Sequence, residues 1–268
     1  MLTNLHTHTA FCDGDHTPEE IVLAALEAGF VSVGFSGHGY TSFDQSYCMQ
    51  DTDGYVETVR ALQRKYADQI DIYLGIEEDA FEPVDRSRFD YIIGSSHYLM
   101  KDGIYYAIDS DYDCFSTCLR VFDQDVLQMA EAYYKNFSRY ICERKPDIVG
   151  HFDLLTKFDE SEDAPRFLQN EAYFEIAERY LKQALQSEAI FEVNTGAISR
   201  GYRTSPYPHE RLLYAIFKQG GKITLTSDCH VANALACHFD EAKAMLKEIG
   251  FDGFYVFRRD HFEKVALP

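Results

Sequence analysis

The sequence predicts an α/β fold in which parallel strands alternate with helices. Two patterns support this fold class. Short runs of β-branched and aromatic residues alternate with stretches whose apolar residues recur at helical spacing, and histidines or carboxylates follow most of these runs. A chain of 268 residues without a linker or a low-complexity segment favours a single domain, residues 1–268. Such alternation requires a parallel sheet, which is either open or closed into a barrel.

Seven or eight strands are expected, over residues 3–6, 31–36, 70–76, 89–93, 147–150, 189–193, 222–226 and 253–257. Helices are expected over residues 18–28, 51–68, 123–143, 168–187, 209–219 and 239–249. The first helix has a well-defined start, because Thr17 can cap it, Pro18 takes its first position and Glu20 completes a capping box. Residues 100–116, rich in Tyr and Asp, are expected to form a long polar loop beside a substrate.

Composition narrows the possible functions. The net charge of −19 argues against nucleic-acid binding, which depends on Lys and Arg at phosphates. It permits a small phosphorylated substrate, because bound metal cations reverse the field inside a pocket. No apolar run is long enough to cross a membrane, and no secretory signal is recognisable. Seven cysteines without a C-x-x-C pair fit a reduced, cytoplasmic protein, with Cys12 and Cys229 as packing residues.

Histidines carry the strongest functional pattern. His6 and His8 follow the first expected strand, and residues two apart on a strand project to the same face, so both imidazoles can reach one metal ion. Of the ten histidines, six follow strands: His6, His8, His38, His97, His151 and His230. In a parallel barrel, the carboxyl ends of the strands gather at one rim.

Carboxylates join the histidines at this rim. Asp13 comes after the first strand, Glu77 after the third, and Asp228 just before His230. The nine donors suit Zn, Mn or Fe, and they exceed the needs of one ion, which indicates two or three divalent ions. Strand alternation does not decide between Glu77 and Glu78, and Asp13-Gly14 is also a common turn pair.

These short motifs resemble those of the PHP (polymerase and histidinol phosphatase) family. The matching pieces occur in the family's order: His6-Thr7-His8-Thr9 with Asp13-Gly14, Gly37-His38, Gly75-Ile76-Glu77, Ser96-His97, Gly150-His151 and Ser227-Asp228-Cys229-His230. The resemblance implies a distorted (β/α)7 barrel, similar to a TIM barrel, with a trinuclear metal site. It implies three sets of ligands. The first ion would be bound by His6, His8, Glu77 and Asp228, the second by Glu77, His97 and His151, and the third by Asp13, His38 and His230. It also selects Glu77 over Glu78.

Gly37 departs from the family pattern, which usually has Asp before this histidine. An outer-sphere carboxylate is therefore expected to be missing beside His38. Many relatives also carry His where this chain has Asp13 or Gly14. Asp is the other common form, and His16 is the alternative ligand.

A second resemblance is to the histidinol-phosphatase branch of the family. It consists of Glu192-Val193-Asn194-Thr195-Gly196 followed by Arg200, Arg203, Tyr207-Pro208 and Leu212-Leu213. Arg200 and Arg203 follow a strand end, where a guanidinium can hold phosphate through two hydrogen bonds, and Lys157 is a third candidate. Asp109, Asp111 and Asp113 are candidates for receiving a substrate ammonium group, although acidic loops are commonly just solvated.

These features lead to the hypothesis of a metal-dependent phosphomonoester hydrolase. Its first candidate substrate is L-histidinol phosphate, which would be cleaved to L-histidinol and phosphate in histidine biosynthesis. A metal-bridging hydroxide would attack phosphorus in line, and Asp228 and His230 are the candidate catalytic groups beside the leaving alkoxide. The alternative within the family is a phosphoesterase for another small phosphorylated metabolite or a nucleotide.

Two rivals come from other classes. A non-catalytic metal-binding module would lack some of the ligands, and every expected position is filled here. An amidohydrolase-type C–N hydrolase commonly has a Lys between its metals, and no lysine stands at a strand end.

Overall fold

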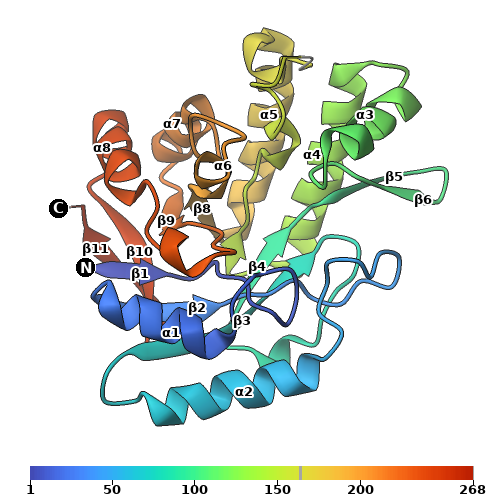
Figure 1. Cartoon of the computed structure of the whole chain (residues 1–268). Helices are drawn as coiled ribbons and strands as arrows, with labels where there is room; N and C mark the ends of the chain where they lie inside the picture. Colours follow the sequence, from blue (N-terminus) through green and yellow to red (C-terminus); the bar gives the residue numbers. More distant parts are fainter. Residues whose placement is uncertain (163–164, 268) are drawn as a thin grey trace.

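The computed structural model describes residues 1–162 and 165–267 (Figure 1). Its centre is a sheet of seven strands in the order β1, β2, β3, β4, β7, β8, β9, and each neighbouring pair is parallel. The strands are β1 (Leu2–Asn4), β2 (Phe30–Phe35), β3 (Asp71–Asp79), β4 (Tyr91–Ser95), β7 (Ile148–Val149), β8 (Ile190–Asn194) and β9 (Lys222–Thr226).

The two edges of the sheet meet just beyond the ends of β1 and β9. The backbone N–H of His8 donates to the carbonyl of Cys229 at 2.8 Å, and the N–H of Cys229 donates to the carbonyl of His6 at 3.0 Å. The sheet is therefore a nearly closed parallel barrel, which confirms the (β/α)7 expectation. Because the bonds join the two histidine-bearing segments, barrel closure also positions the first and last predicted ligands.

Tyr91 fills the inside of the barrel beneath these strand ends. Its hydroxyl donates to the carbonyls of Leu5 and Phe35, so one side chain of β4 spans to β1 and β2. A Cβ at Gly34 would lie 2.4 Å from the Tyr91 hydroxyl, and one at Gly75 only 2.3 Å from the ring. Both strands carry glycine at these points because the tyrosine takes the space.

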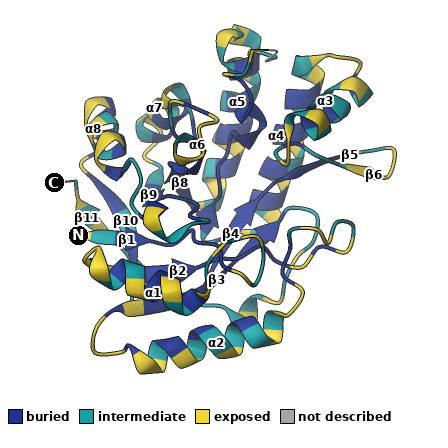
Figure 2. Ribbon diagram, in the orientation of Figure 1, coloured by how far each residue is buried: buried dark blue, intermediate teal, exposed yellow. Residues whose placement is uncertain are grey.

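Helices cover the outside of the barrel and turn their buried faces towards it (Figures 1 and 2). They are α1 (Pro18–Glu27), α2 (Thr52–Lys65), α3 (Tyr112–Val121), α4 (Val126–Arg144), α5 (Glu171–Ala184), α6 (Gly196–Ser199), α7 (Glu210–Lys218) and α8 (Phe239–Ile249). The predicted start of α1 is confirmed, since Thr17 and Glu20 form both bonds of a capping box and Pro18 opens the helix. Within the described residues, no helix combines the length and apolar character needed to cross a membrane.

One expectation about elements is wrong, and one expected strand forms outside the parallel sheet. Residues 100–116 are not one polar loop, because β5 (Tyr98–Lys101) and β6 (Ile104–Ala107) form an antiparallel hairpin and α3 begins at Tyr112. Asp102 and Gly103 make its turn, both with positive φ. The last predicted strand, β10 (Gly253–Arg258), does not join the parallel sheet, since it pairs antiparallel with β11 (His261–Ala266).

Candidate metal centre

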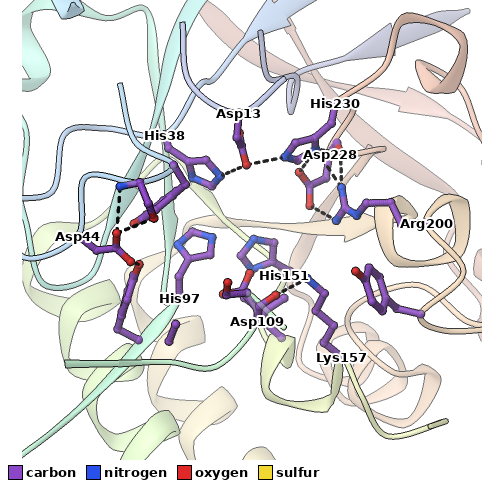
Figure 3. A pocket seen from close by; sticks show the side chains of 17 residues that line it. Asp13, His38, Asp44, His97, Asp109, His151, Lys157, Arg200, Asp228 and His230 are labelled. Atoms are coloured by element: carbon purple, nitrogen blue, oxygen red, sulfur yellow. Dashed lines mark hydrogen bonds and ion pairs between the residues drawn. The ribbon is translucent and has the colours of Figure 1, made fainter. Parts of the chain in front are cut away.

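The nine predicted ligands meet at the carboxyl ends of the barrel strands, beside a cavity of about 300 Å³ whose lining residues are drawn in Figure 3. Each strand that contributes does so at or just after its end: β1 through His6 and His8, β2 through His38, β3 through Glu77, β4 through His97, β7 through His151, and β9 through Asp228 and His230. Asp13 comes from the turn that follows β1. Six of the nine line the cavity, while His6, His8 and Glu77 lie buried beneath it.

Glu77 lies at the centre of the cluster. Five imidazole nitrogens surround its two oxygens: His38 Nδ1 at 2.9 Å, His6 Nε2 at 3.3 Å and His8 Nε2 at 3.5 Å from Oε2, and His151 Nε2 at 3.1 Å and His97 Nε2 at 3.4 Å from Oε1. Because the two oxygens face different sets of histidines, this carboxylate is placed to bridge two ions.

Glu78 points away from the cluster, as strand alternation requires once its neighbour points inward. Its Oε1 accepts a hydrogen bond from the Tyr140 hydroxyl at 2.7 Å, and its Oε2 is 2.9 Å from Arg144 Nη2. The Val84 backbone N–H donates to the same Oε2. Glu78 is therefore a buried structural acid that anchors α4 to the barrel.

The donors fall into overlapping groups. His6, His8 and Asp228 form one group whose donor atoms lie within 4.8 Å of one another, and Asp13, His38 and His230 form another that also includes His8. The remaining groups share Glu77: one adds His38 and His97, the other His6 and His151. The first group contains the donors expected for the first ion apart from Glu77, and the second contains those expected for the third ion together with His8. His97 and His151, expected at the second ion, fall in different groups, both of which contain Glu77.

Several donor atoms of this cluster are buried without a hydrogen-bond partner among the described residues. They are His6 Nε2, His8 Nε2 and both carboxylate oxygens of Glu77. A buried polar atom without a partner costs roughly 1–3 kcal/mol, so four such atoms facing one another need a common partner. Imidazole nitrogens and carboxylate oxygens in this arrangement fit divalent cations such as Zn, Mn or Fe.

The carboxylates and imidazoles of the cluster lie close enough to shift one another's pKa values. Burial, followed by the neighbouring His230 and His38, lowers the pKa of His8 to about 3, so its imidazole is neutral with a free lone pair. Burial would raise the pKa of Glu77, but the surrounding imidazoles, His6 foremost, hold it well below its ordinary value. Glu77 therefore stays ionised and His8 neutral. The facing carboxylates act the other way on three imidazoles: although burial opposes it, they raise the pKa of His6 and His38 well above the ordinary value and that of His97 to about 10. Metal binding would release protons from these three side chains.

Two carboxylates that the sequence analysis did not select contact the Nδ1 atoms of His6 and His97, on the side of each ring that faces away from Glu77. Glu192 Oε2 is 2.8 Å from His6 Nδ1, and Asp79 Oδ2 is 3.2 Å from His97 Nδ1. Such contacts fix the tautomer and the ring orientation of a ligand. The signal was available, because Asp79 stands two residues after Glu77 on one strand and therefore projects to the same side.

The space beside Gly37 is filled by other side chains. A Cβ there would lie 3.0 Å from Cys12 Sγ and 3.0 Å from Met49 Cε, so no room remains for a carboxylate at this position. His38 instead faces Glu77 through Nδ1 and Asp13 through Nε2, the latter at 3.6 Å. His16 belongs to none of the donor groups, and its Nδ1 accepts from the Ala232 backbone N–H.

The three predicted phosphate-binding side chains occupy two different places. Arg200 and Lys157 line the cavity. Arg200 Nη2 is 3.0 Å from Asp228 Oδ2, and Lys157 donates to the backbone carbonyl of Asp109 (Figure 3). Arg203 is 3% exposed and lies outside the lining of this cavity, where it donates to the Thr156 hydroxyl at 2.7 Å. The expectation that it holds phosphate therefore does not fit its position.

Of the three loop carboxylates, only Asp109 lines this cavity. Asp111 instead caps α3 by accepting from the Cys114 N–H at 2.7 Å, and Asp113 lies in the first turn of that helix. The sequence analysis missed Asp44 and Tyr47, which line the same cavity. They follow β2 in a long segment without regular structure, where the sequence offers no periodicity to place them.

The PHP domain family model matches residues 4–196 of the chain. A probable histidinol-phosphatase of Schizosaccharomyces pombe is 26% identical over 272 residues, which cover 93% of this chain and 87% of the relative. A histidinol-phosphatase of Lactococcus lactis is 25% identical over 273 residues, covering 94% of this chain and 93% of the relative.

Two solved structures share the fold. A putative histidinol phosphatase from Listeria monocytogenes superposes with a TM-score of 0.76 at 21% identity, covering 89% of this chain and 99% of the other. The Lactococcus lactis histidinol phosphate phosphatase, solved with zinc, L-histidinol and phosphate, gives a TM-score of 0.69 at 20% identity, with 98% and 99% coverage. These likenesses extend along nearly the whole chain, so the barrel described above is shared as one unit.

Proposed function

The chain belongs to the PHP domain family, and from this premise we propose that it is a metal-dependent phosphomonoester hydrolase acting on L-histidinol phosphate. The products would be L-histidinol and phosphate. The observation that carries the proposal is the cluster of nine side chains centred on Glu77, next to a cavity with two cationic side chains. Several buried atoms of this cluster have no hydrogen-bond partner among the described residues. The names of the relatives, which span the same length of chain, support this choice of substrate.

We assign the metal ligands as His6, His8, Glu77 and Asp228 for one ion, Glu77, His97 and His151 for a second, and Asp13, His38 and His230 for a third. When bound, divalent ions at these positions supply a nucleophile from water at neutral pH and neutralise charge on a phosphoryl group. The chain's own contribution is to hold the ligands in fixed directions. Glu192 and Asp79 perform this task for His6 and His97.

Arg200 and Lys157 are placed to receive the phosphoryl oxygens. Both line the cavity, and Arg200 is fixed by Asp228, so its guanidinium is oriented before substrate arrives. Lys157 is 9% exposed, and its ammonium group also lies 4.5 Å from the centre of the Tyr202 ring. Pre-oriented cations in a partly dry pocket stabilise transferred phosphoryl charge more strongly than mobile surface cations do.

The leaving oxygen needs a proton or a cation as the ester bond breaks. Asp228 and His230 line the cavity on the side of Arg200, and His230 Nδ1 lies 2.9 Å from the Asp228 carbonyl. We assign the catalytic role at the leaving group to this pair, which as metal ligands would place a cation, and not a proton of their own, beside the leaving oxygen. Asp109 and Asp44, with Tyr47, contribute acidic and aromatic side chains to the same cavity, which suits a leaving group that carries positive charge.

An assay of phosphate release tests the proposed reaction and substrate directly. Purified protein loaded with Zn, Mn or Fe(II) is expected to release phosphate from L-histidinol phosphate with a higher kcat/KM than from a panel of sugar phosphates, nucleotides and p-nitrophenyl phosphate. A preference for a nucleotide or another metabolite would overturn the substrate and leave the reaction class in place. No release from any ester by metal-loaded protein would overturn the class.

A further inference from the structure

His151 differs from the other histidines of the cluster in what lies behind its ring. His6, His97 and His230 each place the second nitrogen against an oxygen, of Glu192, Asp79 and the Asp228 carbonyl respectively. The Nδ1 atom of His151 is buried and has no hydrogen-bond partner among residues 1–162 and 165–267. A metal-binding imidazole almost always donates this second N–H, so the partner remains to be identified.

Two further buried polar atoms close to His151 are also without partners in the described part of the chain: the Tyr207 hydroxyl and Asp153 Oδ1. The Tyr207 ring lies edge-on to the His151 ring, with centroids 6.2 Å apart. Tyr207 is fully buried, and its backbone is bonded in both directions to Asn194 at the end of β8, so its ring is held in place.

Asp153 lies two residues after His151 and is completely buried. Its Oδ2 accepts from the His209 N–H at 2.9 Å and lies 3.7 Å from Arg203 Nη1, while the Arg203 guanidinium lies 4.6 Å from the centre of the Tyr207 ring. Arg203 therefore touches both Tyr207 and Asp153, which places these side chains in one buried group.

We propose that Tyr207 is the positioning residue for His151. The His151 Nδ1–H is connected to the Tyr207 oxygen, and the Tyr207 hydroxyl to Asp153 Oδ1, each through an ordered water, because none of these atoms lies within direct hydrogen-bond reach of another. This arrangement gives each of the three unpartnered atoms a bond in a single relay. It directs the Nε2 lone pair of His151 towards Glu77 Oε1, 3.1 Å away, where these two side chains would hold a metal ion. It also explains why Arg203 is buried, because its charge stabilises the Asp153 carboxylate at the end of the relay.

The proposal rests on the metal-binding part of the proposed function and is independent of the substrate. Its test compares Tyr207→Phe with Tyr134→Phe. Both changes remove one hydroxyl from a completely buried tyrosine, but the Tyr134 hydroxyl already has a partner, that of Tyr173 at 2.6 Å, and its ring packs against Phe152. Two quantities are measured: the chelator concentration that removes Zn²⁺ from the loaded protein, and the visible absorption spectrum of the Co²⁺-loaded protein.

Tyr207→Phe is expected to lower Zn²⁺ affinity at one site by about 10–100-fold and to change the Co²⁺ spectrum. Tyr134→Phe is expected to change neither. If a folded Tyr207→Phe protein retains Zn²⁺ against the chelator as well as the wild type does, and its Co²⁺ spectrum is unchanged, the proposal is overturned. If that variant does not fold, Asp153→Asn is measured in its place, and unchanged metal binding in it would likewise overturn the relay.

Wild-type protein that binds Co²⁺ but releases no phosphate from L-histidinol phosphate would refute the proposed substrate. The comparison between the two tyrosine variants would still decide the role of Tyr207.

Discussion

At the scale of single residues, Glu77 and Glu78 are sequence neighbours with opposite surroundings. Glu77 faces five imidazoles, whereas Glu78 faces Arg144 and Tyr140. We predict that Glu77→Gln, which keeps the size and removes the charge, loses at least one ion per chain and reduces activity by more than the roughly 10–100-fold typical of outer-layer changes. Elemental analysis and phosphate release measure both effects.

Glu78→Gln is the matched control. It is expected to keep its metals and its activity while lowering the free energy of unfolding by roughly 1–3 kcal/mol, because the buried bonds to Tyr140 and Arg144 are weakened. If the two variants lost metal equally, Glu77 would not be the bridging ligand.

Lys157 gives a pH-dependent prediction. Burial lowers its pKa below that of an exposed lysine, so its positive charge is lost earlier as the pH rises. The KM for the phosphoester is therefore expected to increase on the alkaline side in the wild type. Lys157→Arg, which stays charged, is expected to remove this increase. Identical alkaline profiles of the two proteins would show that Lys157 does not bind the phosphoryl group.

Most ligands could be predicted from the sequence because each follows a strand, and strand ends converge in any parallel barrel. Asp79 was equally accessible by strand alternation, two positions after Glu77. Arg203 could not be placed this way. It lies in an irregular segment after β8, where only the folded chain reveals that its guanidinium packs on Tyr207.

At the scale of elements, Gly75 allows β3 to pack against the ring of Tyr91 inside the barrel. An added Cβ would lie 2.3 Å from the ring of Tyr91, which crosses the barrel at this point. Gly75→Ala is expected to lower the free energy of unfolding by about 1–3 kcal/mol or more, as overpacking does. Chemical denaturation measures the loss. Combining it with Tyr91→Leu, which vacates the space, is expected to cost less than the sum of the two single changes, and strict additivity would contradict the contact.

The β5–β6 hairpin shows where prediction of elements failed and why. Asp102-Gly103 between apolar residues is a strong hairpin signal, and both residues adopt the positive φ that such a two-residue turn requires. The surrounding Tyr and Asp residues gave a polar composition that concealed the signal. The antiparallel pairing of β10 was harder to foresee, because its apolar run resembles those of the parallel strands and only the position of β11 distinguishes it.

At the scale of the whole molecule, the metal centre connects segments from residue 6 to residue 230. Ligands from six strands of the barrel converge on it, and the hydrogen bonds that close the barrel lie next to them. Metal ions are therefore expected to stabilise the fold as well as the site. At a free metal concentration about 100 times the Kd of one site, the free energy of unfolding increases by about 2.7 kcal/mol, which raises Tm by roughly 5–10 °C. Calorimetry with and without chelator measures this shift, and an unchanged Tm would contradict it.

The central claim is that nine convergent donors hold two or three divalent ions that this chain uses to hydrolyse a phosphomonoester. Its most direct test is elemental analysis and L-histidinol phosphate turnover on the same preparation, before and after chelation. Two to three ions per chain are predicted, with phosphate release that disappears on chelation and returns when Zn, Mn or Fe(II) is added. Full activity in protein stripped of its metals would contradict the claim.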